Sequence, residues 1–168
     1  MSKEAPAGYS RMQIVLHWAV AVLVVVQFLL GPAMSSFVEA ERTGADPGFG
    51  ALAWAHVGVG LAILLLAFWR VGLRFANGVP APAFEPKTPE QEFIAFLTRE
   101  LSFFLYLTIF ALPITGAIGW FYQNEVATSV HGSMKVLVIV IVGVHIAISL
   151  FHQFVLRNGA LDRMRRPN

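Results

Sequence analysis

Cysteine is absent from this chain of 168 residues, and only 13% of its residues carry a charge. A chain without cysteine forms no disulfide bond, holds no thiolate-ligated iron–sulfur cluster and attaches no haem covalently. Any cofactor must therefore have other ligands, of which histidine is the main candidate. The scarcity of charge accompanies 57% hydrophobic residues and a mean hydropathy of +0.66, a composition that indicates surrounding lipid rather than water.

Four hydrophobic stretches occupy residues 12–30, 51–69, 101–122 and 134–156. Each is about as long as a helix that crosses the hydrocarbon core of a bilayer, which needs roughly 20 residues. The sequence therefore predicts an all-α integral membrane protein, a four-helix bundle that forms one domain over residues 1–168. A soluble bundle with unusually apolar helices is the alternative. The first stretch is too long for a signal peptide and contains His17 and Gln27.

The basic residues predict the orientation of this bundle, because cytoplasmic loops carry an excess of Lys and Arg. Two basic residues, Arg42 and Lys135, fall on the outer side. The other ten fall on the opposite side, which places both termini in the cytoplasm: Lys3, Arg11, Arg70, Arg74, Lys87, Arg99, Arg157, Arg163, Arg165 and Arg166. Because these residues lie beside hydrophobic stretches and the net charge is only +2, no nucleic-acid partner is expected.

All five histidines lie within the hydrophobic stretches or at their mouths, namely His17, His56, His131, His145 and His152. A polar side chain in lipid costs free energy unless it has a partner, so each intramembrane histidine is a candidate functional residue. For any single histidine, a hydrogen bond to a neighbouring helix is the alternative explanation.

The depths of four histidines predict two pairs. His131 and His145 are separated by about 21 Å along one helix and by about 40° around it, so both face the bundle interior near opposite membrane surfaces. His17 comes early in a helix that leaves the cytoplasm, and His56 comes early in a helix that enters from outside. We therefore expect His17 to face His145, and His56 to face His131.

Two imidazoles at one depth on facing helices are the ligands that a six-coordinate haem iron requires. The four paired histidines are thus predicted to bind two b haems, stacked across the membrane as a path for electrons. A zinc or other metal cluster would need the histidines at a single depth, which the separation of about 21 Å argues against.

His152 is left over once four ligands are assigned, and it lies about 10 Å beyond His145 toward the cytoplasm. There it is expected to hydrogen-bond the carbonyl of a quinone and to transfer a proton as the quinone is reduced. The alternative is an interfacial polar residue without a catalytic role.

Arg11, Arg70 and Arg74 stand where the propionates of the inner haem would emerge, and arginine binds carboxylates through paired hydrogen bonds. Lys135 follows His131 by one helical turn, where it could bind a propionate of the outer haem. All four side chains also fit simpler roles, the arginines as cytoplasmic anchors and Lys135 as a side chain that extends to the outer interface. The sequence leaves both readings open.

Several short motifs occur in a recognisable order. They are Tyr-Ser-Arg-x-Gln-x-x-x-His-Trp at 9–18, His-x-x-x-Gly at 56–60, Arg-x-x-x-Arg at 70–74, Ala-Leu-Pro-x-x-Gly at 111–116 and Leu-x-Arg-Met at 161–164. Together with His131, His145 and His152, this set resembles the bacterial cytochrome b561 family over nearly the whole chain.

The resemblance implies a di-haem b cytochrome of the bacterial inner membrane. Some members of that family oxidise superoxide at the periplasmic face and pass the electrons to ubiquinone. By this resemblance, His152 matches a position associated with the quinone site, and the haem ligands match His17, His56, His131 and His145.

The outer loops raise a question about the substrate. They contain Glu39, Glu41, Asp46 and Glu125, whereas an anion such as superoxide is collected best by positive potential. Lys135 offsets this charge locally, so we name it, with His152, as a candidate catalytic residue. The alternative function is an electron relay or membrane anchor that links a dehydrogenase or a soluble periplasmic redox protein to the quinone pool. A haem-free structural protein is a third possibility.

Overall fold

The computed structural model describes the chain except residues 1–5, 7, 47, 49, 82–84 and 168, so Lys3 lies outside the described residues. It contains four long helices: α1 (Arg11–Thr43), α2 (Gly50–Asn77), α3 (Pro89–Phe121) and α4 (Glu125–Phe154). A short 3-10 helix, η1 (Asp162–Met164), follows near the C-terminus. Each of the four long helices is long and apolar enough to cross a membrane. The prediction of an all-α membrane protein is confirmed.

Helix α1 begins and ends at residues whose chemistry favours those boundaries. The Ser10 hydroxyl accepts a hydrogen bond from the Gln13 main-chain N–H, and the Gln13 side chain accepts one from the Ser10 N–H. This reciprocal capping satisfies two N–H groups that have no partner inside the helix. At the other end, Gly44 has a φ of 70°, a left-handed conformation that glycine adopts at little cost.

The helices extend beyond the hydrophobic stretches that predicted them. Helix α1 continues from residue 30 to Thr43, α3 begins at Pro89 rather than at 101, and α4 begins at Glu125 rather than at 134. Hydropathy detects only the part of a helix that lies in hydrocarbon, whereas capping side chains decide where the helix starts. Asn124 is such a cap, since its side chain accepts a hydrogen bond from the Ala127 N–H at 2.9 Å. As a consequence, His131 lies inside α4 rather than at its mouth.

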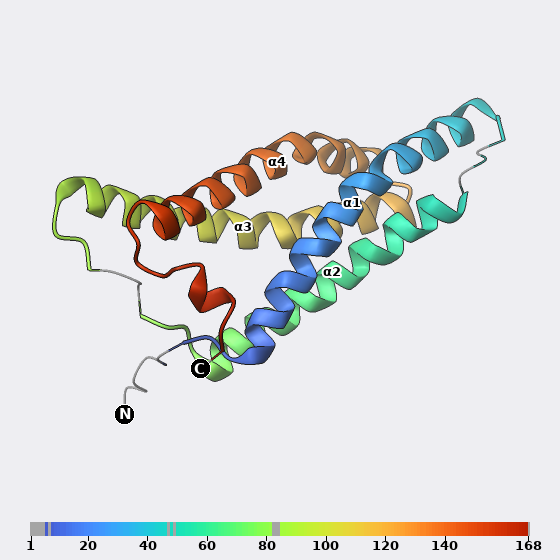
Figure 1. Ribbon diagram of the computed structural model, residues 1–168. Helices are drawn as coiled ribbons and strands as arrows, with labels where there is room; N and C mark the ends of the chain where they lie inside the picture. Colours follow the sequence, from blue (N-terminus) through green and yellow to red (C-terminus); the bar gives the residue numbers. More distant parts are fainter. Residues whose placement is uncertain (1–5, 7, 47, 49, 82–84, 168) are drawn as a thin grey trace.

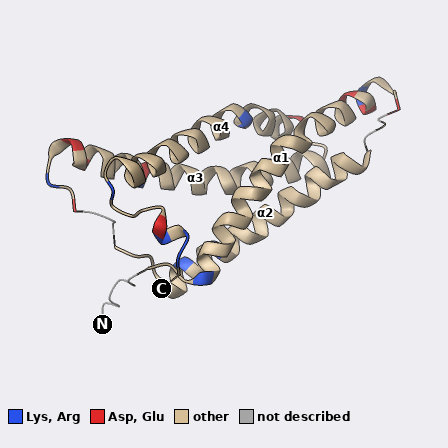
Figure 2. Ribbon diagram, viewed as in Figure 1, with Lys and Arg blue, Asp and Glu red and all other residues tan. Residues whose placement is uncertain are grey.

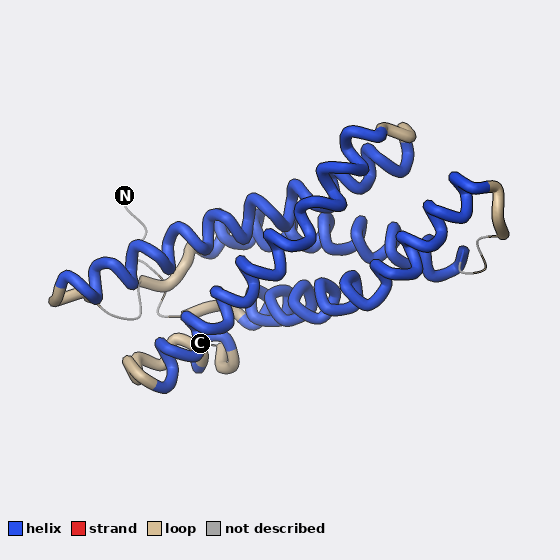
Figure 3. The backbone as a smooth tube through the Cα atoms, turned by 90° about the horizontal axis from the view of Figure 1, so that it is seen from above, coloured by secondary structure: helices blue, strands red, loops and turns tan. Residues whose placement is uncertain are grey.

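The four helices form two antiparallel hairpins. Helix α1 packs along α2, α3 packs along α4, and α2 also contacts α3. The two hairpins come together at one end of the molecule and are separated at the end where both chain termini lie (Figures 1 and 3). Every histidine predicted as a ligand therefore lies on α4 or on one of the two helices of the first hairpin.

Large apolar side chains cover the outside of the bundle. Leu29 and Leu65 are 75% and 70% exposed, although each lies near the middle of a long helix. Charged residues occur mainly at helix ends and in the connections, with long uncharged stretches between them (Figure 2). A protein in water would not expose so much apolar surface, so the bundle is a multi-pass membrane protein.

The segment after α4 connects the two hairpins at the end that holds the termini. The Trp18 indole N–H donates to the Met164 carbonyl at 2.8 Å, which ties this segment to α1. The Arg163 guanidinium donates to the Ala81 carbonyl at 2.7 Å, which ties it to the connection between α2 and α3. These bonds hold the Leu-x-Arg-Met motif against the bundle.

Candidate functional site

The inner pair of histidines lies between α1 and α4. The ring centres of His17 and His145 are 6.3 Å apart, and the planes of the two rings make an angle of 60°. The Nδ1 atom of His17 is buried and has no hydrogen-bond partner in the structure. Buried polar atoms are nearly always paired, so this ring is held at a position that calls for a partner.

The outer pair lies between α2 and α4. The ring centres of His56 and His131 are 6.1 Å apart, and the ring planes are almost perpendicular at 83°. Nδ1 of His131 is 2.8 Å from the Leu112 carbonyl oxygen on α3. Because a carbonyl oxygen can only accept, Nδ1 carries the hydrogen, and the neutral ring keeps the lone pair of Nε2 for a metal.

Gly116 allows this close packing of His131 against α3. A Cβ atom at Gly116 would come within 2.9 Å of the Cε1 and Nδ1 atoms of the His131 ring. Any residue larger than glycine would therefore displace the ring or the helix. The glycine of the Ala-Leu-Pro-x-x-Gly motif thus provides the space in which His131 lies.

The separation of the rings within each pair suits one metal ion between two imidazoles. With a metal–nitrogen bond of about 2 Å on each side and roughly 1 Å from each nitrogen to its ring centre, the two centres lie about 6 Å apart. The observed separations of 6.3 and 6.1 Å agree with this value. No group of three or more metal-binding side chains occurs among the described residues, so each site offers two protein ligands, the number that a six-coordinate haem iron takes.

A basic and aromatic cluster lies near the inner pair, toward the end of the bundle that holds both termini. The guanidinium carbons of Arg70 and Arg74 are 5.9 and 5.7 Å from the centre of the Tyr106 ring, within the range of cation–π attraction. Arg70 is also close enough to His17 and His145 to interact with both electrostatically.

No carboxylate in the described part of the chain forms an ion pair with Arg70, Arg74 or Arg11. Arg70 and Arg74 thus present two positive charges without a counterion near the inner pair, whereas Arg11 is exposed at the start of α1. Tyr9 lies beside Arg74 and Tyr106, outside the spans, and burial raises its pKa above the usual value while Arg74 acts in the opposite direction.

Lys135 is the corresponding basic residue at the outer pair. It lies on α4, one turn from His131, and is close enough to His56 to interact with it electrostatically. Within the described ranges Lys135 forms no ion pair with a carboxylate. One positive charge therefore accompanies the outer pair, as Arg70 accompanies the inner one.

His152 is buried, with only 5% of its surface exposed. Its Nε2 is 3.3 Å from the Thr98 hydroxyl, and its Nδ1 is 2.7 Å from the Asn158 amide nitrogen. The Asn158 amide N–H donates, so Nδ1 of His152 is the acceptor. The Thr98 hydroxyl already donates to the Ile94 carbonyl at 2.8 Å. The Thr98 hydroxyl oxygen therefore accepts from Nε2–H of His152. The ring is therefore neutral and links α3 to the segment after α4.

The sequence did not predict several residues of the site. The Leu112 carbonyl carries no sequence signal, because any residue supplies a main-chain oxygen. Thr98, Tyr106 and Asn158 are common polar or aromatic residues whose roles follow only from helix packing. Gln27 does carry a signal, since an uncharged polar residue within an apolar span is unusual.

The chain was compared with known proteins. Residues 8–167 match the model of the family described as prokaryotic cytochrome b561. This chain belongs to that family. It is also 36% identical to a protein named cytochrome b562 from Cereibacter sphaeroides, over 160 residues that cover 95% of this chain and 96% of that relative. The prediction of the family is confirmed, and this member of the cytochrome b561 family is a haem b electron-transfer protein of a bacterial membrane.

Proposed function

We propose that this cytochrome binds two b haems, one between His17 and His145 and one between His56 and His131. The observation that carries the proposal is the ring separation of about 6 Å in both pairs, the spacing of two imidazoles on one metal. Haem b supplies one-electron redox chemistry. With two histidine ligands each, the irons would have no free position for a substrate, so the haems would supply electron transfer without binding the substrate.

The basic residues support this assignment of the cofactor. Arg70 and Arg74 near the inner pair, and Lys135 near the outer pair, lack carboxylate partners in the part of the chain that is described. Haem carries two propionates, and guanidinium groups bind carboxylates well. We assign Arg70 and Arg74, with Arg11 at the start of α1, to the inner propionates.

The reaction that we propose moves electrons from superoxide to ubiquinone. Each superoxide loses one electron at the outer end and leaves as oxygen. Two such electrons, with two protons from the cytoplasm, convert one ubiquinone to ubiquinol at the inner end. Lys135 attracts the anion to the outer pair, since a local positive charge raises the encounter rate of a negative substrate.

For the quinone end, we propose His152 as the residue that hydrogen-bonds the quinone and transfers a proton. A pocket of about 210 Å³, lined by Glu85, Lys87, Gln91, Leu156 and Asn158, adjoins the amide that bonds His152. A quinone carbonyl, which can only accept, would replace the Thr98 hydroxyl oxygen as the acceptor from Nε2–H.

The experiment is to supply superoxide steadily to the purified cytochrome in detergent with a soluble ubiquinone. The proposal predicts that the haems become reduced and that ubiquinone is consumed. Lys135→Met should slow reduction severalfold at low ionic strength, and the difference should shrink as salt screens the charge. Arg166→Met, at an exposed position of the opposite end, is the matched control. Haems that stay oxidised with superoxide, but are reduced by dithionite, would rule out superoxide as the donor.

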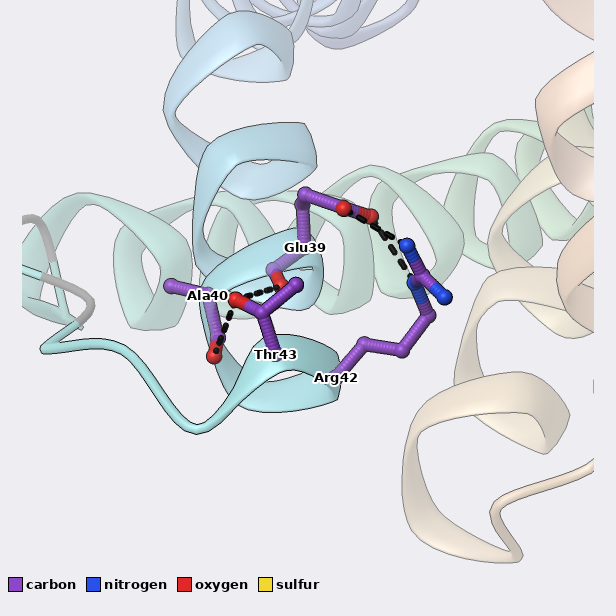
Figure 4. A network of polar contacts seen from close by, with 4 residues as sticks. All are labelled: Glu39, Ala40, Arg42 and Thr43. Carbon is purple, nitrogen blue, oxygen red and sulfur yellow. Dashed lines mark hydrogen bonds and ion pairs between the residues drawn. The ribbon is translucent and has the colours of Figure 1, made fainter.

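A second candidate function is a relay for a basic periplasmic redox protein, and one observation favours it. Arg42, at the outer end of α1, donates to both carboxylate oxygens of Glu39, at 3.0 and 2.7 Å (Figure 4). This pair neutralises the positive charge of Arg42 and leaves Glu41 and Asp46 without an ion-pair partner in the described residues. An acidic outer end would attract a basic partner.

The electron donor distinguishes this relay from an enzyme that oxidises superoxide. A reduced basic c-type cytochrome should then reduce this protein rapidly at low salt and slowly at high salt, whereas superoxide alone should not. Charge reversal at Glu41 and Asp46 should remove the salt dependence. A reduction rate that is independent of both salt and these substitutions would argue against docking at this end.

A further inference from the structure

Helix α1 carries a polar side chain deep in the membrane that has no part in the proposal so far. Gln27 lies ten residues after His17, within the apolar span. Its side-chain oxygen, Oε1, is buried and has no hydrogen-bond partner in the structure. A buried amide without a partner costs free energy, and more so in lipid, so the position of Gln27 calls for a hydrogen-bond donor.

The neighbouring helix α2 carries a possible donor. Nδ1 of His56 on α2 is also buried and also lacks a partner. The main chain of Gln27 is close enough to interact with the His56 ring. The Gln27 amide packs against α2 at Gly60, where a Cβ atom would come within 3.0 Å of its Nε2. Gly60 follows His56 by one helical turn on the same face.

The two histidines of the outer pair differ in the hydrogen bonding of their Nδ1 atoms. His131 donates its Nδ1–H to the Leu112 carbonyl, which fixes the tautomer and leaves the lone pair of Nε2 available to a metal. Nδ1 of His56 has no such bond of ordinary geometry, although the Gln27 main chain lies near the ring and the unpaired side-chain oxygen of Gln27 lies on the same neighbouring helix. A histidine that ligates a metal almost always donates its other N–H to a carbonyl, a carboxylate or water.

We infer that Gln27 is the positioning residue of His56: its side-chain carbonyl accepts the Nδ1–H of His56 and thereby sets the electronic character of the outer haem ligand. The inference rests on the proposed ligation of haem by His56. A reorientation of the Gln27 amide would direct Oε1 toward the ring. Gly60 provides the space that this amide occupies, which gives the glycine of the His-x-x-x-Gly motif a function.

This arrangement has an electrochemical consequence. A hydrogen bond from Nδ1–H to a carbonyl makes the imidazole a stronger electron donor, which stabilises ferric over ferrous iron and lowers the midpoint potential. Loss of the acceptor should raise the potential of the outer haem. Loss of such a partner typically changes metal affinity or activity by about 10–100-fold. We expect an effect at the lower end of this range, roughly tenfold in the redox equilibrium, which is about 59 mV for a one-electron couple.

The test is a redox titration of Gln27→Met, which keeps the length of the side chain but removes the acceptor. The same titration in a His145→Ala background, which should retain only the outer haem, shows which midpoint potential belongs to the outer haem. We expect a higher outer potential in Gln27→Met, while in the otherwise wild-type protein the inner potential stays unchanged. Gln27→Glu, which restores an acceptor, should return the outer potential to the wild-type value or below it.

Two further variants separate positioning from packing. Gly60→Ala should push the Gln27 amide away from its place and raise the outer potential in the same direction as Gln27→Met. Val25→Met, at a lipid-facing position of α1 that is 60% exposed, should change neither potential. An unchanged outer potential in Gln27→Met, or an equal shift at both haems, would overturn the inference.

A failure of the underlying proposal would look different from a failure of the inference. If His56 were no haem ligand, His56→Ala would keep both haems, and the role of Gln27 would fail with it. If His56→Ala loses the outer haem but Gln27→Met leaves its potential unaltered, only the role of Gln27 is wrong.

Discussion

At the residue scale, the site depends on the hydrogen bonds and packing contacts that hold each histidine ring as much as on the histidines themselves. The sequence identified all four paired rings, because a histidine in an apolar span is conspicuous. It did not identify the Leu112 carbonyl that fixes His131, since a main-chain oxygen is present at every residue. The partner of a ring depends on the rotation of the neighbouring helix, which a hydropathy pattern does not determine.

Gly116 provides a test at this scale. Gly116→Ala would place a Cβ atom 2.9 Å from two atoms of the His131 ring and should push the ring away from the Leu112 carbonyl. We expect the outer haem to bind roughly tenfold more weakly, as is usual when the support of a metal ligand is lost. Titration of haem into the apoprotein, followed by absorbance, measures this affinity.

The matched control is Gly143→Ala on α4, where a Cβ atom would meet no other atom within 4 Å. This variant should bind both haems as tightly as the wild type. Equal haem affinity in the Gly116 and Gly143 variants would show that His131 does not depend on this close contact.

At the element scale, the four spans were predictable from hydropathy, but their ends were not. Caps such as the Ser10–Gln13 pair lie outside the hydrocarbon core and leave no hydropathy signal. The segment after α4 was recognised only as a motif. Its attachment through Trp18 and Arg163 joins residues far apart in the sequence, which spacing within a single chain does not reveal.

Trp18→Phe tests the attachment of that C-terminal segment. The substitution removes the hydrogen bond from the Trp18 indole to the Met164 carbonyl and should cost about 1 kcal/mol of the stability of the docked segment. We expect trypsin to cleave severalfold faster after Arg163 and Arg165. Trp54→Phe, at the outer end, keeps the ring contact with Trp120 and should leave cleavage unchanged. Equal cleavage of wild type and Trp18→Phe would mean that the segment is held by other contacts.

At the scale of the whole molecule, the orientation in the membrane follows from the distribution of charge. Figure 2 shows charges at the ends of the bundle and long uncharged stretches between them, and both termini lie at the same end (Figure 1). The positive-inside rule assigns that end to the cytoplasm. The relation between the two hairpins was not predictable, because apolar faces alone do not specify which helices are neighbours.

The absence of native cysteine makes the orientation simple to measure. Glu41→Cys should react with a membrane-impermeant maleimide in intact spheroplasts, because this residue lies at the outer end of α1. Arg166→Cys should react only after the membrane is permeabilised. The reverse labelling pattern would invert the orientation and would place the His17–His145 pair near the periplasm.

The central claim is that each pair of facing histidines holds one haem b. The most direct measurement quantifies haem b and protein in the same purified sample, for the wild type and for variants of one histidine from each pair. We predict two haems per chain in the wild type, one in His145→Ala, one in His56→Ala and none when the two substitutions are combined. Two haems retained in His145→Ala, or fewer than two in a fully loaded wild type, would contradict the account.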